Sequence, residues 1–404
     1  MVKESDPMTT TCPTPVRERA HESFPVPALV VMACTGFIVI MTETLPAGLL
    51  PQLAAGLDVS EGGAGQLVSA YAIGTVLSAI PAIALTRGAR RKPLLLAGLL
   101  GFLVANAVTA ISPSFTVALV ARFVGGAFSG LLWGMLAGYA RRIAAPEHAG
   151  RALAIAMAGT PVALCVGTPL GAWLGSTVGW RWSFAAMSLL SVLVMVCAKF
   201  LVPDAPGQSA QTRAPLSRVL GIPGVATVLA VVFVWMLAHN LLYTYIASYL
   251  QQMRVALRLD VTLLVFGVAA LAGIWITGAF IDSALRRLTL ASVVLFIVAG
   301  AFLAAAQQST VLVLLAIVLW GLAFGGSATQ LQTAMGEAAG ENADAANAML
   351  TTSFNMAIFA GGAVGAVVVD GVGAPVLPAG MIALTLMALV MVGLGRRAAF
   401  PAGR

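Results

Sequence analysis

The chain has 404 residues, of which 60% are hydrophobic and only 9% are charged. A soluble domain carries about 25% charged residues, so this chain has too few polar residues to cover the surface of a soluble protein. It is predicted to be an integral membrane protein. The net charge of +7 does not indicate nucleic-acid binding, because the basic residues lie in short clusters between apolar runs, where membrane topology accounts for them.

Twelve apolar runs are long enough to cross a bilayer, which requires about 20 helical residues. They lie at 26–50, 64–86, 93–111, 114–140, 152–178, 183–202, 223–249, 261–282, 289–306, 310–334, 346–369 and 375–395. The sequence therefore predicts an all-α membrane protein with twelve transmembrane helices. Residues 1–25 are polar and are predicted to form a retained cytosolic tail, with Met8 as an alternative start, and 396–404 form a second tail.

The basic residues predict the orientation of the chain. The tails and even-numbered loops hold 18 of the 22 Lys and Arg residues, whereas the odd-numbered loops hold only Arg181, Arg254 and Arg258. Positive residues concentrate on the cytoplasmic side of membrane proteins. We therefore expect both termini in the cytoplasm and a multi-pass protein of the inner (plasma) membrane.

One long polar break, 203–222 (PDAPGQSAQTRAPLSRVLGI), has the Pro, Gly, Ser and Gln content that is typical of a linker. It separates 26–202 from 223–395. Two features repeat with a shift of 196 residues: Arg90 and Arg91 correspond to Arg286 and Arg287, and Glu43 corresponds to His239. This repeat predicts two pseudo-symmetric six-helix bundles, an arrangement in which transporters place a site between the halves.

Three ionisable residues lie inside the predicted helices: Glu43, Arg122 and His239. At about 1.5 Å per residue they lie roughly 10, 12 and 15 Å from the outer helix ends, in one layer. Ionisable groups are costly at such depths and mark functional sites. We expect Glu43 to alternate between pairing with Arg122 and binding a proton or substrate, although a fixed structural partner could also neutralise it permanently. His239 could pass protons or be a satisfied polar residue beside Asn240 and Tyr243.

Aromatic and polar residues follow these charges at helical spacing. The candidate substrate-cavity residues are Ser129, Trp133, Trp235, Asn240, Tyr243, Trp320, Phe324 and Ser327. Aromatic walls with a few polar tips suit an amphipathic or moderately apolar ligand. Each aromatic residue taken alone is more often part of a core.

Two further groups suggest movement. In the fifth run, small residues allow close helix packing and prolines bend the helix, which predicts a hinge at Gly159, Pro161, Gly167, Pro169 and Gly171, with plain packing as the alternative for the glycines. At the cytoplasmic ends, a basic loop and an acidic loop are expected to clasp the halves when the inner mouth is shut, or simply to be solvated. The candidate gate residues are Arg87, Arg90, Arg91, Asp282, Arg286, Arg287, Glu337 and Glu341.

No nucleotide-binding loop and no zinc, haem or flavin signature is present, and the four cysteines lack metal-ligand spacing. No nucleophile and base lie on neighbouring turns, so we expect neither an enzyme nor a metal or cofactor. The energy source is then expected to be an ion gradient, with protons as the candidate, or there is none. The expected partners are the lipid bilayer, a small-molecule substrate and protons, without nucleic acid, for a monomeric protein.

Several stretches resemble one family. They are TETLPAGLLPQLAAGLDVS, AGQLVSAYAIG, ALTRGARRK, RFVGGAFSG, GTPVALCVGTPLG with GWRWSF, and HNLLYTYIASYL. Together they are similar to the major facilitator superfamily, in its twelve-helix drug/proton antiporter branch near the bacterial sugar-efflux and chloramphenicol-efflux members, over about residues 26–395. The resemblance implies alternating access by two rocking bundles and export coupled to inward proton flow, with Glu43 on the membrane acid of the branch and Arg122 on its helix-four arginine.

The resemblance has departures. The chain has Thr86 where the loop 2–3 signature has Asp, and Ala82 and Ala89 where it has glycines, whereas the second copy keeps Gly278 and Asp282. A charge relay is therefore expected to depend on the second copy. Export of drugs or related metabolites is the first hypothesis. Efflux of sugars or sugar derivatives, uptake by proton symport, and a transport-inactive sensor or scaffold are the alternatives.

Overall fold

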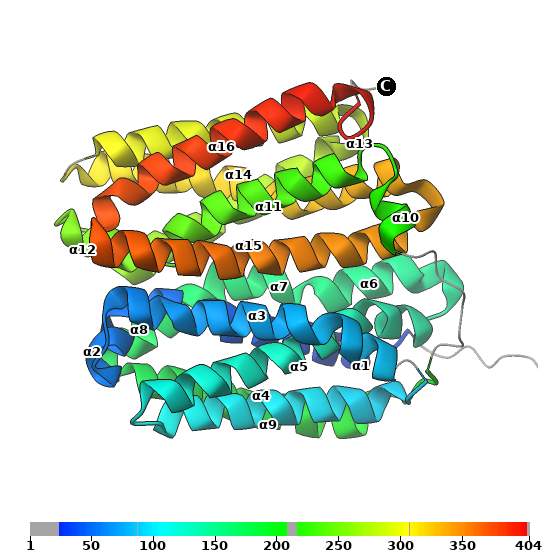
Figure 1. Ribbon diagram of the computed structural model, residues 1–404. Helices are drawn as coiled ribbons and strands as arrows, with labels where there is room; N and C mark the ends of the chain where they lie inside the picture. Colours follow the sequence, from blue (N-terminus) through cyan, green and yellow to red (C-terminus); the bar gives the residue numbers. More distant parts are fainter. Residues whose placement is uncertain (1–23, 87, 208–215, 307, 402–404) are drawn as a thin grey trace, which may run out of the picture.

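The computed structural model describes residues 24–401 except 87, 208–215 and 307, and these described residues form helices joined by short turns (Figure 1). The predicted tail over residues 1–23 and the predicted gate residue Arg87 lie outside them. Elements of the N-terminal half are α1 (Val26–Thr44), η1 (Ala47–Leu49), α2 (Leu50–Leu57), α3 (Glu61–Thr86), α4 (Arg91–Ile111), α5 (Phe115–Arg142), η2 (Pro146–His148), α6 (Ala149–Met157), α7 (Gly159–Val162), η3 (Ala163–Gly167), α8 (Thr168–Thr177) and α9 (Trp180–Leu201).

The C-terminal half follows the short linker helix α10 (Leu216–Leu220). Its elements are α11 (Val225–Tyr243), α12 (Ile246–Gln252), α13 (Leu259–Ala305), α14 (Thr310–Ala339), η4 (Gly340–Asn342), α15 (Ala343–Gly371), η5 (Ala374–Val376), α16 (Leu377–Leu394) and η6 (Gly395–Arg397). The all-helical membrane fold predicted from hydropathy is confirmed.

Ten helical segments of the described residues are long and apolar enough to cross a membrane. The difference from twelve has two sources. The predicted runs at 261–282 and 289–306 form the single 47-residue element α13, which bends where Ala284 leaves the helical region (φ −142°, ψ 26°). The run at 64–86 is covered by α3, which has 26 residues and falls outside the ten. The count of twelve spans stays a prediction.

The internal repeat is visible in the backbone. The first long helix of each half ends early and restarts as a short helix, at Leu50 in α2 and at Ile246 in α12, which are 196 residues apart. Asp58 and Arg254 follow these short helices at the same shift, and both have φ 53°. Left-handed backbone is unusual in residues other than glycine. Two such residues at equivalent positions therefore support the predicted pseudo-symmetry strongly.

The two halves lie side by side (Figure 1). Within the N-terminal half α3 packs on α5 and α4 on α9, and within the C-terminal half α13 packs on α14 and α11 on α15. The halves meet where α3 contacts α15 and where α13 contacts η3 and α8. Both ends of the described chain lie at one end of the helices, which we call the chain-end side, and α2 and α12 lie at the opposite end, the far side.

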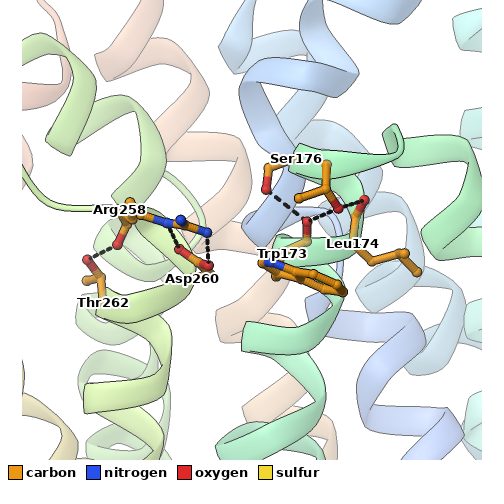
Figure 2. Close-up of polar contacts among 7 residues, drawn as sticks. Trp173, Leu174, Ser176, Arg258, Asp260 and Thr262 are labelled. Atoms are coloured by element: carbon orange, nitrogen blue, oxygen red, sulfur yellow. Dashed lines mark hydrogen bonds and ion pairs between the residues drawn. The ribbon is translucent and has the colours of Figure 1, made fainter.

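Figure 2 shows the polar contacts at the end of α8 and at the start of α13, on the far side. Arg258 precedes α13 and binds Asp260 in its first turn with Nη2–Oδ2 at 2.7 Å. At the end of α8 the hydroxyl of Thr177 and that of Ser176 donate to the Trp173 carbonyl, each at 2.9 Å. An acid in the first turn and hydroxyls on the last carbonyls are favourable helix-end contacts. Each of these contacts joins residues of the same half, and none of them crosses between the halves.

Basic residues on the chain-end side also bind within their own half. Arg90 pairs with Asp204 at 2.6 Å, and Asp204 accepts the Lys92 N–H at 3.0 Å. Burial alone would raise the pKa of Asp204, but the Lys92 N–H and the Arg90 charge outweigh it, so its pKa lies below the usual range. In the second half Arg286 donates to two carbonyls in the last turn of α16, those of Val392 at 2.9 Å and Gly393 at 3.1 Å, and to the Phe400 carbonyl beyond it at 2.9 Å.

We predict that Arg286→Gln lowers the thermal stability of the purified protein by an amount that corresponds to about 2 kcal/mol, because it removes charge-assisted hydrogen bonds to backbone carbonyls. Thermal unfolding in detergent, followed by intrinsic tryptophan fluorescence, measures the loss. Arg287→Gln is the matched control, since Arg287 is exposed. Equal melting temperatures for the two variants would contradict this role of Arg286.

Candidate functional site

The site begins at the end of α1, where Pro46 interrupts the helix. Proline has no N–H, so the carbonyl four residues earlier, that of Thr42, loses its helical donor. Arg122 supplies the donors instead: its Nη1 hydrogen-bonds the Thr42 carbonyl, and its Nη2 donates to the Glu43 carbonyl at 3.3 Å. The arginine thus completes the hydrogen bonding of the α1 end.

Arg122 is 1% exposed. Its Nε donates to the Leu67 carbonyl of α3 at 3.1 Å, and its guanidinium lies 4.7 Å from the ring centroid of Tyr71. Gly126 makes this approach possible, because a Cβ there would overlap the Tyr71 carbonyl. Four contacts from two helices therefore satisfy a cation that would otherwise be costly inside a membrane.

The Glu43 side chain is half-buried beside this cation. The predicted neighbourhood of Glu43 and Arg122 is present, but in this conformation the guanidinium contacts the carbonyl of Glu43, and no ion pair joins the two side chains among the residues that the structure describes. The carboxylate is therefore not fixed by the arginine. Whether it exchanges protons stays a prediction.

Hydroxyl groups continue the polar layer from α1 towards the second half. The Thr44 and Thr168 hydroxyl oxygens, from α1 and from the start of α8, lie 3.1 Å apart. The Tyr243 hydroxyl of α11 lies beside Thr168 and within electrostatic reach of Glu43. A residue of the C-terminal half thus contacts the acid site of the N-terminal half.

His239 lies one helical turn from Tyr243 in an aromatic cage. Its ring stacks on Phe324 with centroids 3.8 Å apart and on Tyr243 at 5.0 Å. The indole N–H of Trp320 donates to its Nδ1 at 3.1 Å, so that nitrogen carries no proton. Phe266 and Phe296 complete the cage, and His239 is 4% exposed. This environment favours the interpretation of His239 as a satisfied neutral residue.

The predicted cavity residues separate into two sets. Tyr243, Trp320 and Phe324 gather around His239, and Ser327 donates to the Phe324 carbonyl at 2.6 Å. Ser129 is fully buried near Tyr71, and its Oγ has no hydrogen-bond partner among the described residues.

The other three do not stack on His239 and have other main contacts. Trp235 packs edge-on against Phe296 in the core of the second half, with centroids 5.5 Å apart. Asn240 donates to the Met236 carbonyl at 2.8 Å and lies against Gly361 of α15. Trp133 packs against the core of the first half. Helical spacing alone placed these residues on one wall because it cannot show which face of each helix meets a neighbour.

The predicted gate residues do not form a latch between the basic and acidic loops in this conformation. Arg90 and Arg286 bind within their own halves, as described above. The Arg91 N–H donates to the Ala205 carbonyl at 2.9 Å. Four other gate residues are exposed: Asp282, Arg287, Glu337 and Glu341. Among the described residues, these four form no ion pair.

The predicted hinge helix is interrupted. After α6 and α7 the backbone becomes π-helical over Ala163–Gly167, and α8 follows. Pro161 and Pro169 flank this turn, and each removes one helical donor. Single π turns occur often at functional sites. The interruption is observed, while its role as a hinge stays a prediction.

The glycines of this helix pack it tightly on α1. A Cβ at Gly159, Gly167 or Gly171 would overlap Ala33, Met41 or Leu45, respectively. On the other side, a Cβ at Gly267 of α13 would lie 2.5 Å from the Cys165 Cα. The π turn is therefore held between α1 of its own half and α13 of the other.

Sequence reasoning missed Tyr71 and Thr168. Tyr71 is fully buried, and its hydroxyl donates to the Val39 carbonyl at 3.0 Å. A large polar-tipped ring within the Ala- and Gly-rich second helix was the available signal. For Thr168 the sequence contains no signal beyond its position between Gly167 and Pro169, because its partner Thr44 comes from a distant part of the chain.

Comparison with known proteins identifies the family. The profile of the Major Facilitator Superfamily matches residues 32–362. The chain belongs to the major facilitator superfamily. It is a multi-pass membrane protein of this transporter family, which contacts lipid and carries small molecules.

Two relatives show the range of similar family members. The chain is 31% identical over 360 residues to a chloramphenicol efflux pump of Mycobacterium tuberculosis, which covers 83% of this chain and 84% of the relative. It is 26% identical over 362 residues to a probable sugar efflux transporter of Helicobacter pylori, with 89% and 92% covered. The resemblance to the drug and sugar efflux branch of the superfamily is thereby confirmed.

Solved structures confirm the fold. The D-xylose-proton symporter superposes with a TM-score of 0.74 at 12% identity, over 92% of this chain and 97% of the symporter. The human organic anion transporter MFSD10 superposes with a TM-score of 0.67 at 18% identity, over 91% and 99%. At these identities the likeness shows the superfamily fold alone.

We predict that Arg122→Gln lowers the free energy of unfolding by about 3 kcal/mol, because buried carbonyls lose a charged donor. Pro46→Ala in the same chain should restore part of this loss, since it returns the missing N–H to Thr42. Thermal unfolding of the two single variants and the double variant measures the coupling. Pro51→Ala is the control, because a first-turn proline in α2 leaves no such gap. Strict additivity of Arg122→Gln and Pro46→Ala would contradict the capping role.

Proposed function

We propose that this protein is a proton-coupled exporter of small, moderately apolar organic molecules, of the drug or antibiotic type, that works by alternating access. The observation that carries the proposal is the half-buried Glu43 carboxylate in the membrane layer. Its basic neighbour Arg122 is engaged by backbone carbonyls. The acid is therefore available to bind a proton or a polar group of the cargo in turn.

The proposal includes the setting of the transporter. Both ends of the described chain lie on one side, in accord with an even number of crossings, and the basic residues favour the cytoplasm for that side. We place the protein in the plasma membrane as a monomer. It uses the proton gradient and needs no cofactor.

The chemistry of the layer favours an amphipathic cargo over a sugar. A sugar needs many free hydrogen-bonding groups, yet most polar groups here already bind one another or the backbone, as in Thr44 with Thr168 and Asn106 with Thr42. The His239 cage offers aromatic faces instead. The M. tuberculosis relative is named a chloramphenicol efflux pump, and such a cargo fits a site with aromatic faces.

Efflux of sugars or sugar derivatives is the second candidate, because the H. pylori relative is named a probable sugar efflux transporter over 92% of its length. Expression in a bacterial strain without its own exporters distinguishes the two. Raised tolerance to chloramphenicol-like drugs that a protonophore abolishes supports the first candidate. Lower sugar accumulation without any change in drug tolerance supports the second.

We predict that Glu43→Gln abolishes proton-driven drug export, because the amide cannot bind and release a proton. Export is measured as drug-induced proton release in inverted vesicles. The variant should retain normal folding, judged by monodisperse elution and by an unchanged melting temperature in detergent. Transport with an unchanged pH dependence would remove Glu43 from the mechanism.

We predict that His239→Gln preserves the pH profile of transport and reduces its rate by less than about fivefold, because a neutral acceptor for the Trp320 N–H is retained. His239→Phe should instead lower the thermal stability, since it leaves that buried N–H without an acceptor. A shifted pH profile in His239→Gln would assign the histidine to proton transfer.

A further inference from the structure

Hydrogen bonds join the two halves at the far side, in a region that the proton site does not use. Asp370, at the end of α15, accepts from the Ser60 hydroxyl at 2.7 Å and from the Gly62 N–H at 3.0 Å. Ser60 also accepts the Gly63 N–H at 2.9 Å, so it caps the start of α3. The carboxylate therefore binds the N-terminus of a long helix of the opposite half, where the helix dipole favours negative charge.

A tyrosine adds a second cross-connection one turn further along. The Tyr245 hydroxyl, from the break between α11 and α12, donates to the Gly362 carbonyl at 2.7 Å and lies 3.5 Å from the Gly62 carbonyl. It is fully buried. Gln66 Nε2 donates to Gly362 at 3.4 Å, and the Ser69 hydroxyl donates to the Phe359 carbonyl at 3.2 Å.

Glycines make the joint close enough for these bonds. A Cβ at Gly62 would overlap the Asp370 carboxylate, one at Gly65 would overlap the Tyr245 hydroxyl, and one at Gly362 would overlap the Ser69 hydroxyl. Below the joint, Val68 and Ala72 of α3 pack against Ile358 of α15.

The two helices are joined along only part of their length. All five cross-half bonds described here start or end between Ser60 and Ser69, in the first part of α3. Nearer the chain-end side, Leu77 and Leu85 of the same helix are 59% and 85% exposed. A joint at one end of a seam is the geometry of a latch on that end.

We propose that Ser60, Gly62, Tyr245, Gly362 and Asp370 form an outer clasp that holds the far-side mouth of the transporter shut in this conformation. It rests on the proposed alternating-access function. The far mouth opens only when α3 separates from α15, which breaks the bonds of Asp370 to Ser60 and Gly62 and the contact of the Tyr245 hydroxyl with Gly62 together. The clasp thereby sets the balance between the two access states, because removal of contacts present in one state alone shifts the population to the other.

The test measures conformation and needs no cargo. Val68→Cys is introduced beneath the clasp after Cys12, Cys34, Cys165 and Cys197 are replaced by serine. A membrane-impermeant maleimide is then added in turn to spheroplasts and to inverted vesicles. Asp370→Ala and Gly62→Ala should each raise the labelling rate from the far side by about five- to tenfold, since several bonds, one of them charge-assisted, are lost. Asp370→Asn, which keeps an acceptor oxygen, should give a smaller increase.

Asp58→Asn is the matched control, because Asp58 is an exposed acid of the same face, two residues before Ser60, and its left-handed backbone suits Asn. Ser60→Ala is the milder variant and carries the test if Asp370→Ala does not reach the membrane. Labelling that is unchanged or reduced in folded Asp370→Ala or Ser60→Ala, and in Gly62→Ala, would overturn the clasp. Raised labelling in a protein that exports none of the compounds tested would keep the clasp and refute the proposed function.

Discussion

The structure depends on how the charge of Arg122 is met inside the membrane. A buried guanidinium needs acceptors for its donors, and here backbone carbonyls provide them: Thr42 and Glu43 at the end of α1 and Leu67 in α3. Pro46 makes one of these carbonyls available, because it cannot donate to Thr42. The arginine, the proline and the close packing of α3 on α5 therefore form one unit. Arg122 therefore holds the backbone of Glu43, whereas the Glu43 carboxylate forms no ion pair with it among the described residues.

This unit belongs to a half that repeats. The matching left-handed residues Asp58 and Arg254 show that both halves turn after their first long helix in the same way. Each half is also tied internally at the chain-end side, by Arg90 on Asp204 and by Arg286 on Phe400, which are again related by the 196-residue shift. Cross-half hydrogen bonds, in contrast, gather at the far side. Halves that are stiff in themselves and joined at one end are suited to move as two bodies.

Sequence reasoning identified the membrane fold and predicted the repeat and a layer of Glu43, Arg122 and His239, because hydropathy and the cost of buried charge depend on residue type alone. It paired Arg122 with the Glu43 side chain because carbonyl acceptors do not appear in a sequence as charges do. The same limit led to the expected gate between loops, since Arg90 had a nearer acid in Asp204. Tyr71, Thr168 and Asp370 were missed because their partners lie far away in the chain. In α13 the two runs that were predicted separately are continuous, and the helix bends at Ala284, within the polar stretch 282–287 that separates them in the sequence.

His239 and Glu43 have different surroundings, and this difference bears on how cargo and proton share the site. His239 is enclosed by aromatic rings and has its Nδ1 occupied by Trp320, so charging it would require the cage to reorganise. Glu43 is half-buried beside Arg122, and the hydroxyl of Tyr243 from the opposite half lies within electrostatic reach of its carboxylate. A neutral hydroxyl can donate to a carboxylate and accept from a carboxylic acid, so it tolerates both protonation states. The acid can therefore change its charge while its neighbours stay in place. That property fits a group whose occupant changes in each cycle.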